Sequence, residues 1–338
     1  MNDKIKAVKE RLGDRLLILA HHYQSDEIVA TADAVGDSLK LAQIAAANKT
    51  AELIVFCGVH FMAETADILT EDRQMVFMPD QRAGCPMADM ADMESAQHAW
   101  DKLTGIFGES IVPVTYINSK AEIKAFCGAH GGTTVTSGNA ASVIKWGFDR
   151  ADKILFLPDQ NLGRNTAYDL GIGLDQMALY HRETGEVEFE GSPEHIKMIL
   201  WDGYCPIHHR ISLKHIKAAR KNHPDAKIYV HPECTFEVAE AADGKGSTEY
   251  LIKATAEGKD FVIGTEQHLV NRLINRNSDK NIAMLDDTAC CEDMGLTNED
   301  SLLKLLEALE RGDYSSRITV DRAIAADALK ALDVMLSL

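Results

Sequence analysis

Residues 229–243 read YVHPECTFEVAEAAD, an apolar strand followed by a short loop with a histidine and a carboxylate, and then by a helix. Residues 55–67, VFCGVHFMAETAD, repeat this order of strand, histidine-containing loop and helix. A second pair of similar stretches, VFMPDQRAG at 76–84 and LFLPDQNLG at 155–163, adds to the internal similarity. Such repetition indicates duplication, and we interpret the chain as three similar α/β units.

Short apolar runs alternate with helical stretches along the chain. Several runs are rich in Val, Ile and Leu, which is typical of parallel strands covered on both faces. The predicted strands lie at 15–20, 52–56, 74–78, 110–117, 133–137, 153–157, 197–201, 227–231, 260–264 and 281–285. The predicted helices lie at 25–48, 61–69, 119–127, 139–146, 212–220, 234–242, 247–257 and 266–275, with one or two more within 298–338.

The predicted fold class is therefore α/β, with three similar αβα (Rossmann-like) domains and parallel sheets joined by right-handed crossovers. We place the first domain at 1–84 plus 285–338, the second at 85–201 and the third at 202–284. Residues 164–196 are the least regular segment and contain the turn signal ETGEVEFEG. We interpret them as a surface insertion in the second domain.

The composition excludes several classes of function. The 338-residue chain has a formal net charge of −17 and no run rich in Lys or Arg, which argues against binding to nucleic acid or to an anionic membrane. Its longest apolar runs have the length of strands, too short for a membrane span. The N-terminal stretch MNDKIKAVKERLGDR lacks the apolar region of a signal peptide, so we expect a cytoplasmic protein.

Groups capable of chemistry gather where the predicted strands end. Ligands of open parallel sheets bind beyond the carboxyl ends of the strands, so these loops are the place to look for a site. The residues found there are His21, Tyr23, Cys85, Tyr116, Asn118, Cys205, His208, His231, Glu233, Cys290 and Cys291. A purely structural protein has no reason to concentrate such groups at strand ends, so we expect an active site there.

The cysteines separate into two groups. Seven scattered cysteines in a cytoplasmic chain argue against a disulfide framework and leave buried thiols or metal ligands. We interpret Cys57, Cys127 and Cys234 as small buried apolar residues. Three strand-end loops each contribute a cysteine, namely Cys85, Cys205 and one of the Cys290–Cys291 pair.

The wide spacing of these three loops differs from the local C-x-x-C pairs of a zinc ribbon. It fits a cubane iron–sulfur cluster held between three domains by three thiolates, which leaves one iron open as a Lewis acid. From spacing alone, ligation and simple burial both remain open for Cys85 and Cys205.

A dozen motifs along the chain resemble those of quinolinate synthase, the A-type enzyme of bacterial de novo NAD synthesis. They occur in the order of that family and cover most of the chain. The motifs are AHHYQ (20–24), GDSLKLA (36–42), GVHFMAETADIL (58–69), GCPMADM (84–90), TYINS (115–119), TSGNA (136–140), LPDQNLGRN (157–165), LWDGYCPIHHR (200–210), HPEC (231–234), GSTEYL (246–251), IGTEQHLVNRL (263–273) and C-x-x-M (291–294).

The resemblance implies three αβα domains in pseudo-threefold arrangement around a central [4Fe–4S] cluster with one open iron. It implies Cys85, Cys205 and Cys291 as the cluster ligands, because the third ligand of the family precedes x-x-Met. The local match is imperfect. Glu292 stands in place of the usual proline and Gly295 in place of the usual lysine, and Cys290 is a rival ligand.

The reaction implied by the resemblance condenses iminoaspartate with dihydroxyacetone phosphate to give quinolinate, phosphate and two waters. Glu233 is the leading acid–base candidate, with Tyr23 and Tyr116 as proton donors or enolate-orienting groups, and with His21 and His231 as carboxylate or phosphate ligands. Substrate contacts are also expected from helix-initiating residues and from residues that line or brace the site. These further residues are Ser38, Met62, Asn118, Ser137, His208 and Thr248.

Other interpretations remain to be weighed against this one. The chain could be another cluster-dependent hydro-lyase, or a non-catalytic iron–sulfur sensor, although redox carriers favour four cysteine ligands and a closed cluster. A zinc enzyme is disfavoured because H-E-x-x-H and C-x-x-C are absent. Because iminoaspartate hydrolyses readily, coupling to an aspartate oxidase or aspartate dehydrogenase would help. The sequence leaves open a regulatory disulfide among Cys57, Cys127 and Cys290.

Overall fold

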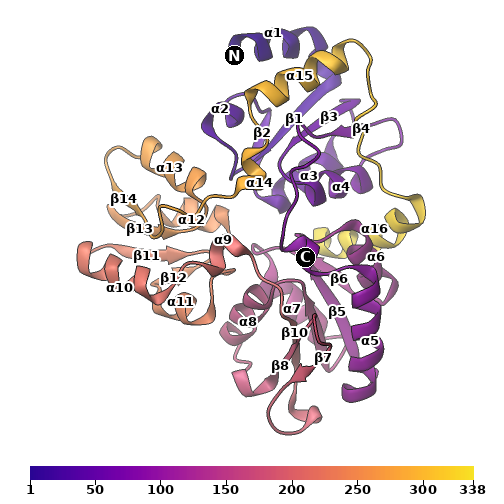
Figure 1. The fold of residues 1–338 in the computed structure, drawn as a ribbon, viewed down its shortest axis with the longest axis vertical. Coiled ribbons are helices and arrows are strands. Elements are labelled where there is room, and N and C mark those ends of the chain that lie inside the picture. Colours follow the sequence, from indigo (N-terminus) through magenta and orange to yellow (C-terminus); the bar gives the residue numbers. More distant parts are fainter.

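The apolar runs form three separate sheets in the computed structural model, which describes residues 1–338 (Figure 1). All ten predicted strands are confirmed, and four further short strands join them. The first sheet has the order β2-β1-β3-β4 and consists of β2 (Ala34–Gly36), β1 (Leu16–His21), β3 (Leu53–Cys57) and β4 (Met75–Phe77). The third sheet has the order β12-β11-β13-β14 and consists of β12 (Gly244–Lys245), β11 (Lys227–Val230), β13 (Asp260–Gly264) and β14 (Asn281–Met284).

The second sheet repeats the same order in its first four strands and then adds two more. It runs β6-β5-β7-β10-β8-β9 and consists of β6 (Thr133–Val135), β5 (Ile111–Tyr116), β7 (Lys153–Leu157), β10 (Met198–Trp201), β8 (Met177–Tyr180) and β9 (Val187–Glu188). All strand pairs are parallel except β8 with β9. The common strand order confirms a fold of three similar αβα units, which surround a central point in Figure 1.

The register brings equivalent strand ends to the same edge in each sheet. In the first sheet Ala20 is paired with Val35 and Cys57, and in the third sheet Val230 is paired with Lys245 and Gly264. The loops after these strands therefore leave the sheets at the edge that faces the other units.

Helices cover both faces of the sheets, which explains why the central strands are buried along their whole length. The helices around the first sheet are α1 (Asn2–Leu12), α2 (Asp26–Val29), α3 (Ser38–Ala47), α4 (His60–Leu69) and α15 (Glu299–Glu310). Those around the second are α5 (Met93–Phe107), α6 (Ala121–Ala129), α7 (Ala140–Phe148) and α8 (Gln160–Asp169). Those around the third are α10 (Leu213–Asn222), α11 (Phe236–Ala241), α12 (Thr248–Ala254) and α13 (Gln267–Arg276), while α9 (Pro206–His209) and α14 (Glu292–Gly295) are short helices near the centre of Figure 1.

One local expectation is wrong. The predicted helix at 25–48 is interrupted, because the Asp33 carboxylate accepts the backbone N–H of Ile18 at 2.8 Å and fixes the chain beside β1, where it forms β2. The segment 164–196, predicted to be a surface insertion, contains the end of α8 and two strands, β8 and β9, that extend the second sheet beyond the four strands common to the units. Helix α5 was not among the predicted helices, although Asp92 and Ser95 form a capping box at its start.

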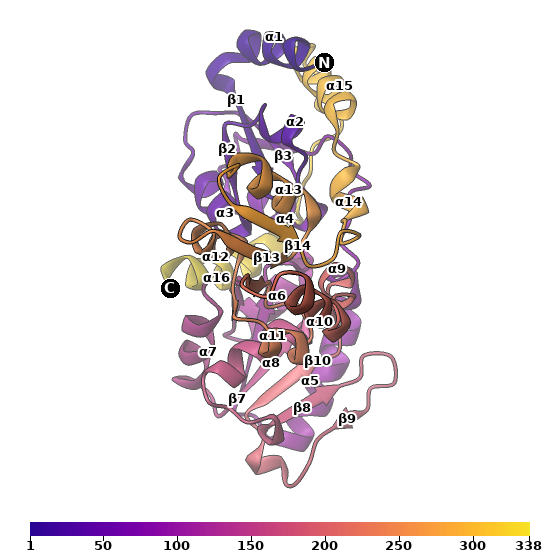
Figure 2. The ribbon, with the colours of Figure 1, turned by 90° about the vertical axis from the view of Figure 1, so that its left-hand side faces the viewer.

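The domain limits at 84, 201 and 284 stay a prediction. The last helix, α16 (Arg322–Ser337), was expected with the first domain, but it packs against α6 and β6 of the second unit and also touches α4 of the first. Figure 2 shows α16 at the level where these two units meet. The hydroxyl groups of Thr133 and Thr134 donate to the carbonyl of Ala331, which fastens α16 over β6. None of the helices combines the length and the apolar character needed to cross a bilayer.

The contact between α6 and α16 depends on a glycine. A Cβ atom on Gly128 would lie 1.9 Å from the backbone carbonyl oxygen of Asp327, a distance that no real pair of atoms adopts. The absence of a side chain at this position therefore lets the two helix backbones approach closely.

We expect Gly128→Ala to lower the free energy of unfolding by about 2 kcal/mol or more, because α16 must move away from α6 to admit the methyl group. The control is Gly105→Ala in α5, where a Cβ has open space around it. That change should raise the free energy of unfolding by about 0.5–1 kcal/mol, since alanine loses less backbone entropy than glycine. Urea unfolding of both variants checks this, and equal effects of the two changes would contradict it.

Candidate active site

A cavity of about 310 Å³ lies where the strand-end loops of the three units meet. All fourteen site residues expected from the sequence line this cavity, and they come from all three units. They are His21, Tyr23, Ser38, Met62, Cys85, Tyr116, Asn118, Ser137, Cys205, His208, His231, Glu233, Thr248 and Cys291. The cavity has the size of a small-metabolite site, and it brings the expected residues together without testing the role assigned to each.

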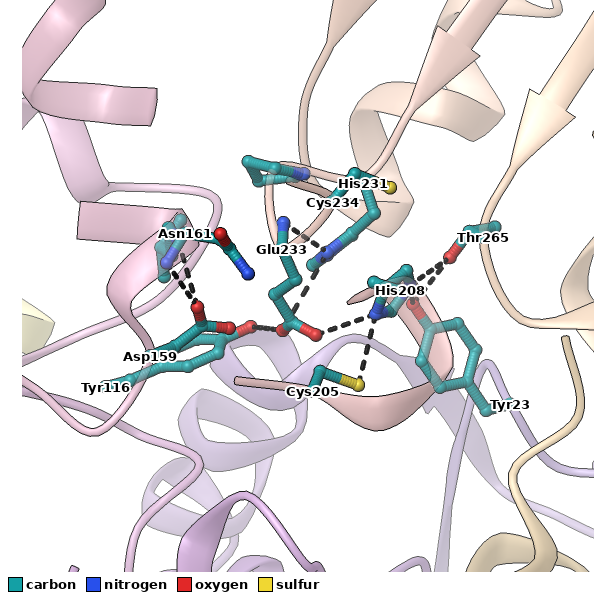
Figure 3. Close-up of polar contacts among 12 residues, drawn as sticks. Tyr23, Tyr116, Asp159, Asn161, Cys205, His208, His231, Glu233, Cys234 and Thr265 are labelled. Atoms are coloured by element: carbon teal, nitrogen blue, oxygen red, sulfur yellow. Dashed lines mark hydrogen bonds and ion pairs between the residues drawn. The ribbon is translucent and has the colours of Figure 1, made fainter. Parts of the chain in front are cut away.

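Glu233 is the centre of the polar network in the cavity (Figure 3). Only 3% of this residue is exposed, yet three side chains surround its carboxylate. The hydroxyl of Tyr116 donates to Oε1 at 2.6 Å, and Nδ1 of His208 lies 2.8 Å from Oε2. Burial by itself raises the pKa of Glu233, but the adjacent His231 and His208 rings and the two hydrogen bonds outweigh burial, so the net pKa lies below its usual range. The carboxylate is therefore held ionised, the form in which a general base acts.

His208 connects Glu233 to a second set of groups. A carboxylate only accepts hydrogen bonds, so Nδ1 of His208 carries the proton that faces Glu233, and the same nitrogen lies 3.3 Å from the Cys205 sulfur. On the other side of the ring, Nε2 lies 3.0 Å from the Thr265 hydroxyl, which is 2.7 Å from the hydroxyl of Tyr23. A continuous chain of exchangeable protons thus runs from Tyr23 through Thr265 and His208 to Glu233.

His21 and His231 occupy the same kind of turn. The backbone N–H of Tyr23 donates to Nδ1 of His21 at 3.2 Å, and that of Glu233 donates to Nδ1 of His231 at 3.4 Å. Burial lowers the pKa of His231 to about 3 and lowers that of His21 well below its usual value, so both rings are neutral at neutral pH. Because Nδ1 accepts in both rings, Nε2–H is free to donate to a ligand oxygen.

The two tyrosines remain protonated donors. Burial, and then the charge of Glu233, raises the pKa of Tyr23 and of Tyr116 well above the usual value. Asp159 is drawn next to Tyr116 in Figure 3, contributes to the raised pKa of that tyrosine and is wholly buried. Burial and the charge of Glu233 raise the pKa of Asp159 as well, while its Oδ2 has no hydrogen-bond partner.

The three expected cysteine ligands share a backbone environment. The sulfur of Cys85 accepts backbone N–H groups of Met87 and Ala88, and the sulfur of Cys205 accepts that of His208. The sulfur of Cys291 accepts those of Asp293 and Met294. Cys205 and Cys291 are the N-cap residues of α9 and α14. Such N–H groups stabilise a thiolate, so the backbone at each of the three positions favours the ionised form of the cysteine, which is the form that binds a metal.

The three thiols also affect one another. After burial, the charge of Cys291 contributes to the raised pKa of Cys85, and that of Cys85 contributes to the raised pKa of Cys205. Cys290 differs, because its thiol is hydrogen-bonded to the side chain of Gln267. None of the three other thiols contributes to the raised pKa of Cys290. All seven cysteines are free thiols, and Cys57, Cys127 and Cys234 are fully buried, as predicted.

A second group of possible metal ligands lies beside Cys290. Donor atoms of Glu266, His268 and Cys290 lie within 4.8 Å of one another. Glu266 is the N-cap of α13, and its carboxylate accepts the backbone N–H and Nδ1–H of His268 as well as the N–H of Cys291. These bonds account for the arrangement as a helix cap that also holds the Cys291 loop.

Several residues around the site escaped the sequence analysis. Thr265 and Glu266 lie directly after β13, and the position of that loop at a strand end was the one available signal. Asp159 occupies the equivalent position after β7, within the repeated PDQ stretch. Arg210, by contrast, belongs to the motif LWDGYCPIHHR quoted above, and it braces the cysteine loop by bonds to Asp286 and Thr288. Each of these roles depends on contacts between distant segments, which no local pattern encodes.

Together, the fold and the cavity define an enzyme that acts on a small polar molecule where three α/β units meet. Residues 3–337 match the family model described as Quinolinate synthetase A protein. The chain is 51% identical over 340 aligned positions to proteins named quinolinate synthase from Bacillus anthracis strain CDC 684, Bacillus cereus strain AH187 and Bacillus thuringiensis subsp. konkukian, and each match covers 99% of this chain and 92% of the relative. The chain therefore belongs to the quinolinate synthase family.

The thiols should differ in reactivity in protein prepared without iron. Burial raises the pKa of Cys85 and Cys291 to about 12, so at pH 8 both are protonated and alkylate slowly. Cys290 is the least enclosed thiol of the cavity and should react with iodoacetamide first. Peptide mass spectrometry of the alkylated chain measures the order, and the fast phase should vanish in Cys290→Ser. Faster labelling of Cys85 or Cys291 would contradict the described environments.

Proposed function

We propose that this enzyme condenses iminoaspartate with dihydroxyacetone phosphate to give quinolinate, phosphate and two waters, with a [4Fe–4S] cluster bound by Cys85, Cys205 and Cys291. The observation that carries the proposal is the convergence of three thiols and an ionised carboxylate, Glu233, in one cavity. The 51% identity to proteins named quinolinate synthase supports the reaction class.

The donor set fits an iron–sulfur cluster. Thiolates are the usual ligands of such clusters, and hydrogen bonds to their sulfurs tune them. Cys85, Cys205 and Cys291 each accept backbone N–H groups, whereas Cys290 is bonded to a side chain, which supports Cys291 as the third ligand. When bound by three cysteines, the cluster supplies one open iron as a Lewis acid.

The residues of the chain supply the proton transfers. Glu233 is ionised and acts as the general base, with Tyr116 holding Oε1 and His208 holding Oε2. Hydrogen bonds connect Glu233 through His208 and Thr265 to Tyr23, which has the hydroxyl needed to protonate a leaving oxygen. Both tyrosines keep their protons at neutral pH, as this role requires.

Substrate binding depends on neutral donors. The free Nε2–H groups of His21 and His231 can donate to carboxylate or phosphate oxygens. Ser38 and Thr248 open α3 and α12, and Ser137 precedes α7, so their hydroxyls and the nearby backbone N–H groups add donors at helix N-termini. Asn118 and Met62 complete the cavity wall.

The proposal also covers the compartment in which the enzyme works and the source of its iminoaspartate substrate. Seven free thiols suit the reducing cytoplasm, where we place the enzyme. Because iminoaspartate hydrolyses readily, we also propose functional coupling to an aspartate oxidase or aspartate dehydrogenase that generates it.

The test of the proposed reaction is anaerobic purification, quantification of iron and sulfide, and assay with both substrates. We expect four irons and four sulfides per chain at full loading, as the formula of the cluster requires. Quinolinate and phosphate should form in equal amounts, and omission of either substrate should abolish both. Loaded protein that forms no quinolinate would overturn the proposal.

The choice between the adjacent cysteines can be tested by substitution. Cys291→Ser should lower cluster content and turnover to background, because it removes one of the three thiolates. Cys290→Ser should leave most of both, because its thiol is bonded to Gln267 outside the ligand set. Iron analysis and the visible absorption of the two anaerobic samples decide the matter, and the reverse result would assign the ligand to Cys290.

Glu233→Gln should separate chemistry from cluster binding. The amide retains the size of the carboxylate but cannot accept a proton, so we expect turnover to fall by about 10²–10⁴-fold. Cluster content should stay at the level of the unmodified enzyme, since Glu233 is not among the proposed ligands. Retained turnover in this variant would remove Glu233 from its proposed role.

A further inference from the structure

The loops that carry Tyr23 and Glu233 are built alike. Each follows the equivalent strand of its sheet, β1 or β11, and in each the residue two places after a histidine donates its backbone N–H to Nδ1 of that histidine. The turn fixes Tyr23 relative to His21 and Glu233 relative to His231. It does not fix the whole loop relative to the other units, which supply the rest of the site.

A buried asparagine from the second unit holds the Glu233 loop. Asn165, on α8, is fully buried. Its Nδ2 group donates to the carbonyls of Pro232 and Cys234, both at 2.9 Å. These are the carbonyls immediately before and after Glu233. The amide thus uses both of its protons on the two peptide groups that flank the proposed base.

The side-chain oxygen of Asn165 supports a specific role for these two bonds. Oδ1 is buried and has no hydrogen-bond partner, an arrangement that is unfavourable for a polar atom removed from water. An apolar side chain would avoid that cost but would leave both loop carbonyls without donors. Asn165 therefore leaves its side-chain oxygen without a donor, while its Nδ2 group donates to both loop carbonyls.

A buried arginine from the third unit holds the Tyr23 loop in the same way. Arg272, on α13, is 3% exposed. Its guanidinium donates to the carbonyl of His22 at 2.7 Å and to the carbonyl of Gln24, the two carbonyls that flank Tyr23. A third bond, from Nε to Asp26 at 2.6 Å, anchors the end of the same loop.

The two residues occupy equivalent positions in the repeat. Asn165 is the sixth residue of α8 and Arg272 the sixth of α13, and both helices follow the third strand of their four-strand repeat. The sixth residue of α4 in the first unit is Thr65, which is buried but donates only to Phe61 of its own helix. Thr65 is thus a natural control that crosses to no other unit.

We propose that Asn165 and Arg272 are positioning residues, each of which reaches across a boundary between units and sets a reactive side chain, Glu233 and Tyr23 respectively, against the rest of the active site. The inference rests on the proposed function, because it assigns a purpose to the placement of those two side chains. Neither residue lines the cavity, so each acts through the loop that it holds.

This arrangement has a definite kinetic consequence. Misplacement of a reacting group by about 1 Å can cost about 10²-fold in rate. When one loop loosens, its histidine moves with it, but the substrate contacts made by the rest of the cavity persist, so substrate affinity changes less than the rate. Loss of either holding residue should therefore lower kcat much more than it raises KM.

The test compares Asn165→Leu and Arg272→Lys with Thr65→Val in the cluster-loaded enzyme. Leucine is close in size to asparagine and has no donors, lysine keeps the charge without the guanidinium fork, and valine removes only the Thr65 hydroxyl. We expect kcat to fall by about 10–100-fold in the first two variants with KM within about threefold, and to change little in Thr65→Val. Should Asn165→Leu fail to fold, Asn165→Ser removes the same two bonds with less crowding.

Hydrogen exchange gives a readout independent of turnover. In Asn165→Leu, amide exchange should rise at residues 231–236 and stay unchanged at 21–26, and Arg272→Lys should give the opposite pattern. A uniform rise over the chain, or a loss of kcat no larger than in Thr65→Val, would overturn the inference and leave only a structural role.

A double-mutant cycle separates this inference from the proposed function. If Asn165 acts through Glu233, then Asn165→Leu should not further lower the residual rate of Glu233→Gln. Full turnover in Glu233→Gln would refute the role of Glu233 itself. Loss of turnover in Glu233→Gln together with normal turnover in Asn165→Leu would refute only the positioning role.

Discussion

An ionised carboxylate sealed from water at the junction of three units is the constraint on which the site depends. Glu233 is 3% exposed, and an isolated buried carboxylate would become protonated instead of remaining charged. The bonds from Tyr116 and His208 reverse this tendency. These two partners come from different segments of the chain, so the charge is stable only when the loops that carry them are assembled.

The repeated topology explains how one chain achieves this assembly. Three sheets with the same strand order direct equivalent loops toward one point, so duplication of a single unit multiplies the groups available to one cavity. The copies have then diverged in chemistry. After β1 the turn presents a tyrosine and after β11 the same turn presents a carboxylate, whereas β5 ends at Tyr116 and is followed by Asn118. The common geometry supplies the convergence, and the differences supply distinct polar groups.

The sequence predicted the strands well because the central strands are buried on both faces and so form continuous apolar runs. The short edge strands β2 and β12 were missed because two or three residues carry no periodic signal, and only their pairing with β1 and β11 defines them.

The active-site residues that could be predicted are those in the loops directly after the strands. Asn165, Arg272 and Thr265 escaped because their polar groups act on peptide groups or side chains at least 57 positions away in the chain. The sequence left the choice of third ligand between Cys290 and Cys291 open for a similar reason, since adjacent residues share one local sequence and differ only in the direction of their side chains.

The charge of the cavity limits how it can bind anions. Arg210 is the only Lys or Arg side chain among the lining residues, which include five acidic residues, namely Asp37, Glu233, Glu266, Glu292 and Asp293. Arg210 is itself engaged by Asp286. An anionic substrate therefore cannot depend on ion pairing with the chain. Its affinity has to come from neutral donors held in fixed directions, such as the Nε2–H groups of His21 and His231 and the hydroxyls at the helix starts. Burial keeps these two imidazoles neutral, and the same burial makes each of their hydrogen bonds stronger than it would be in water, which compensates for the lack of cations in the cavity.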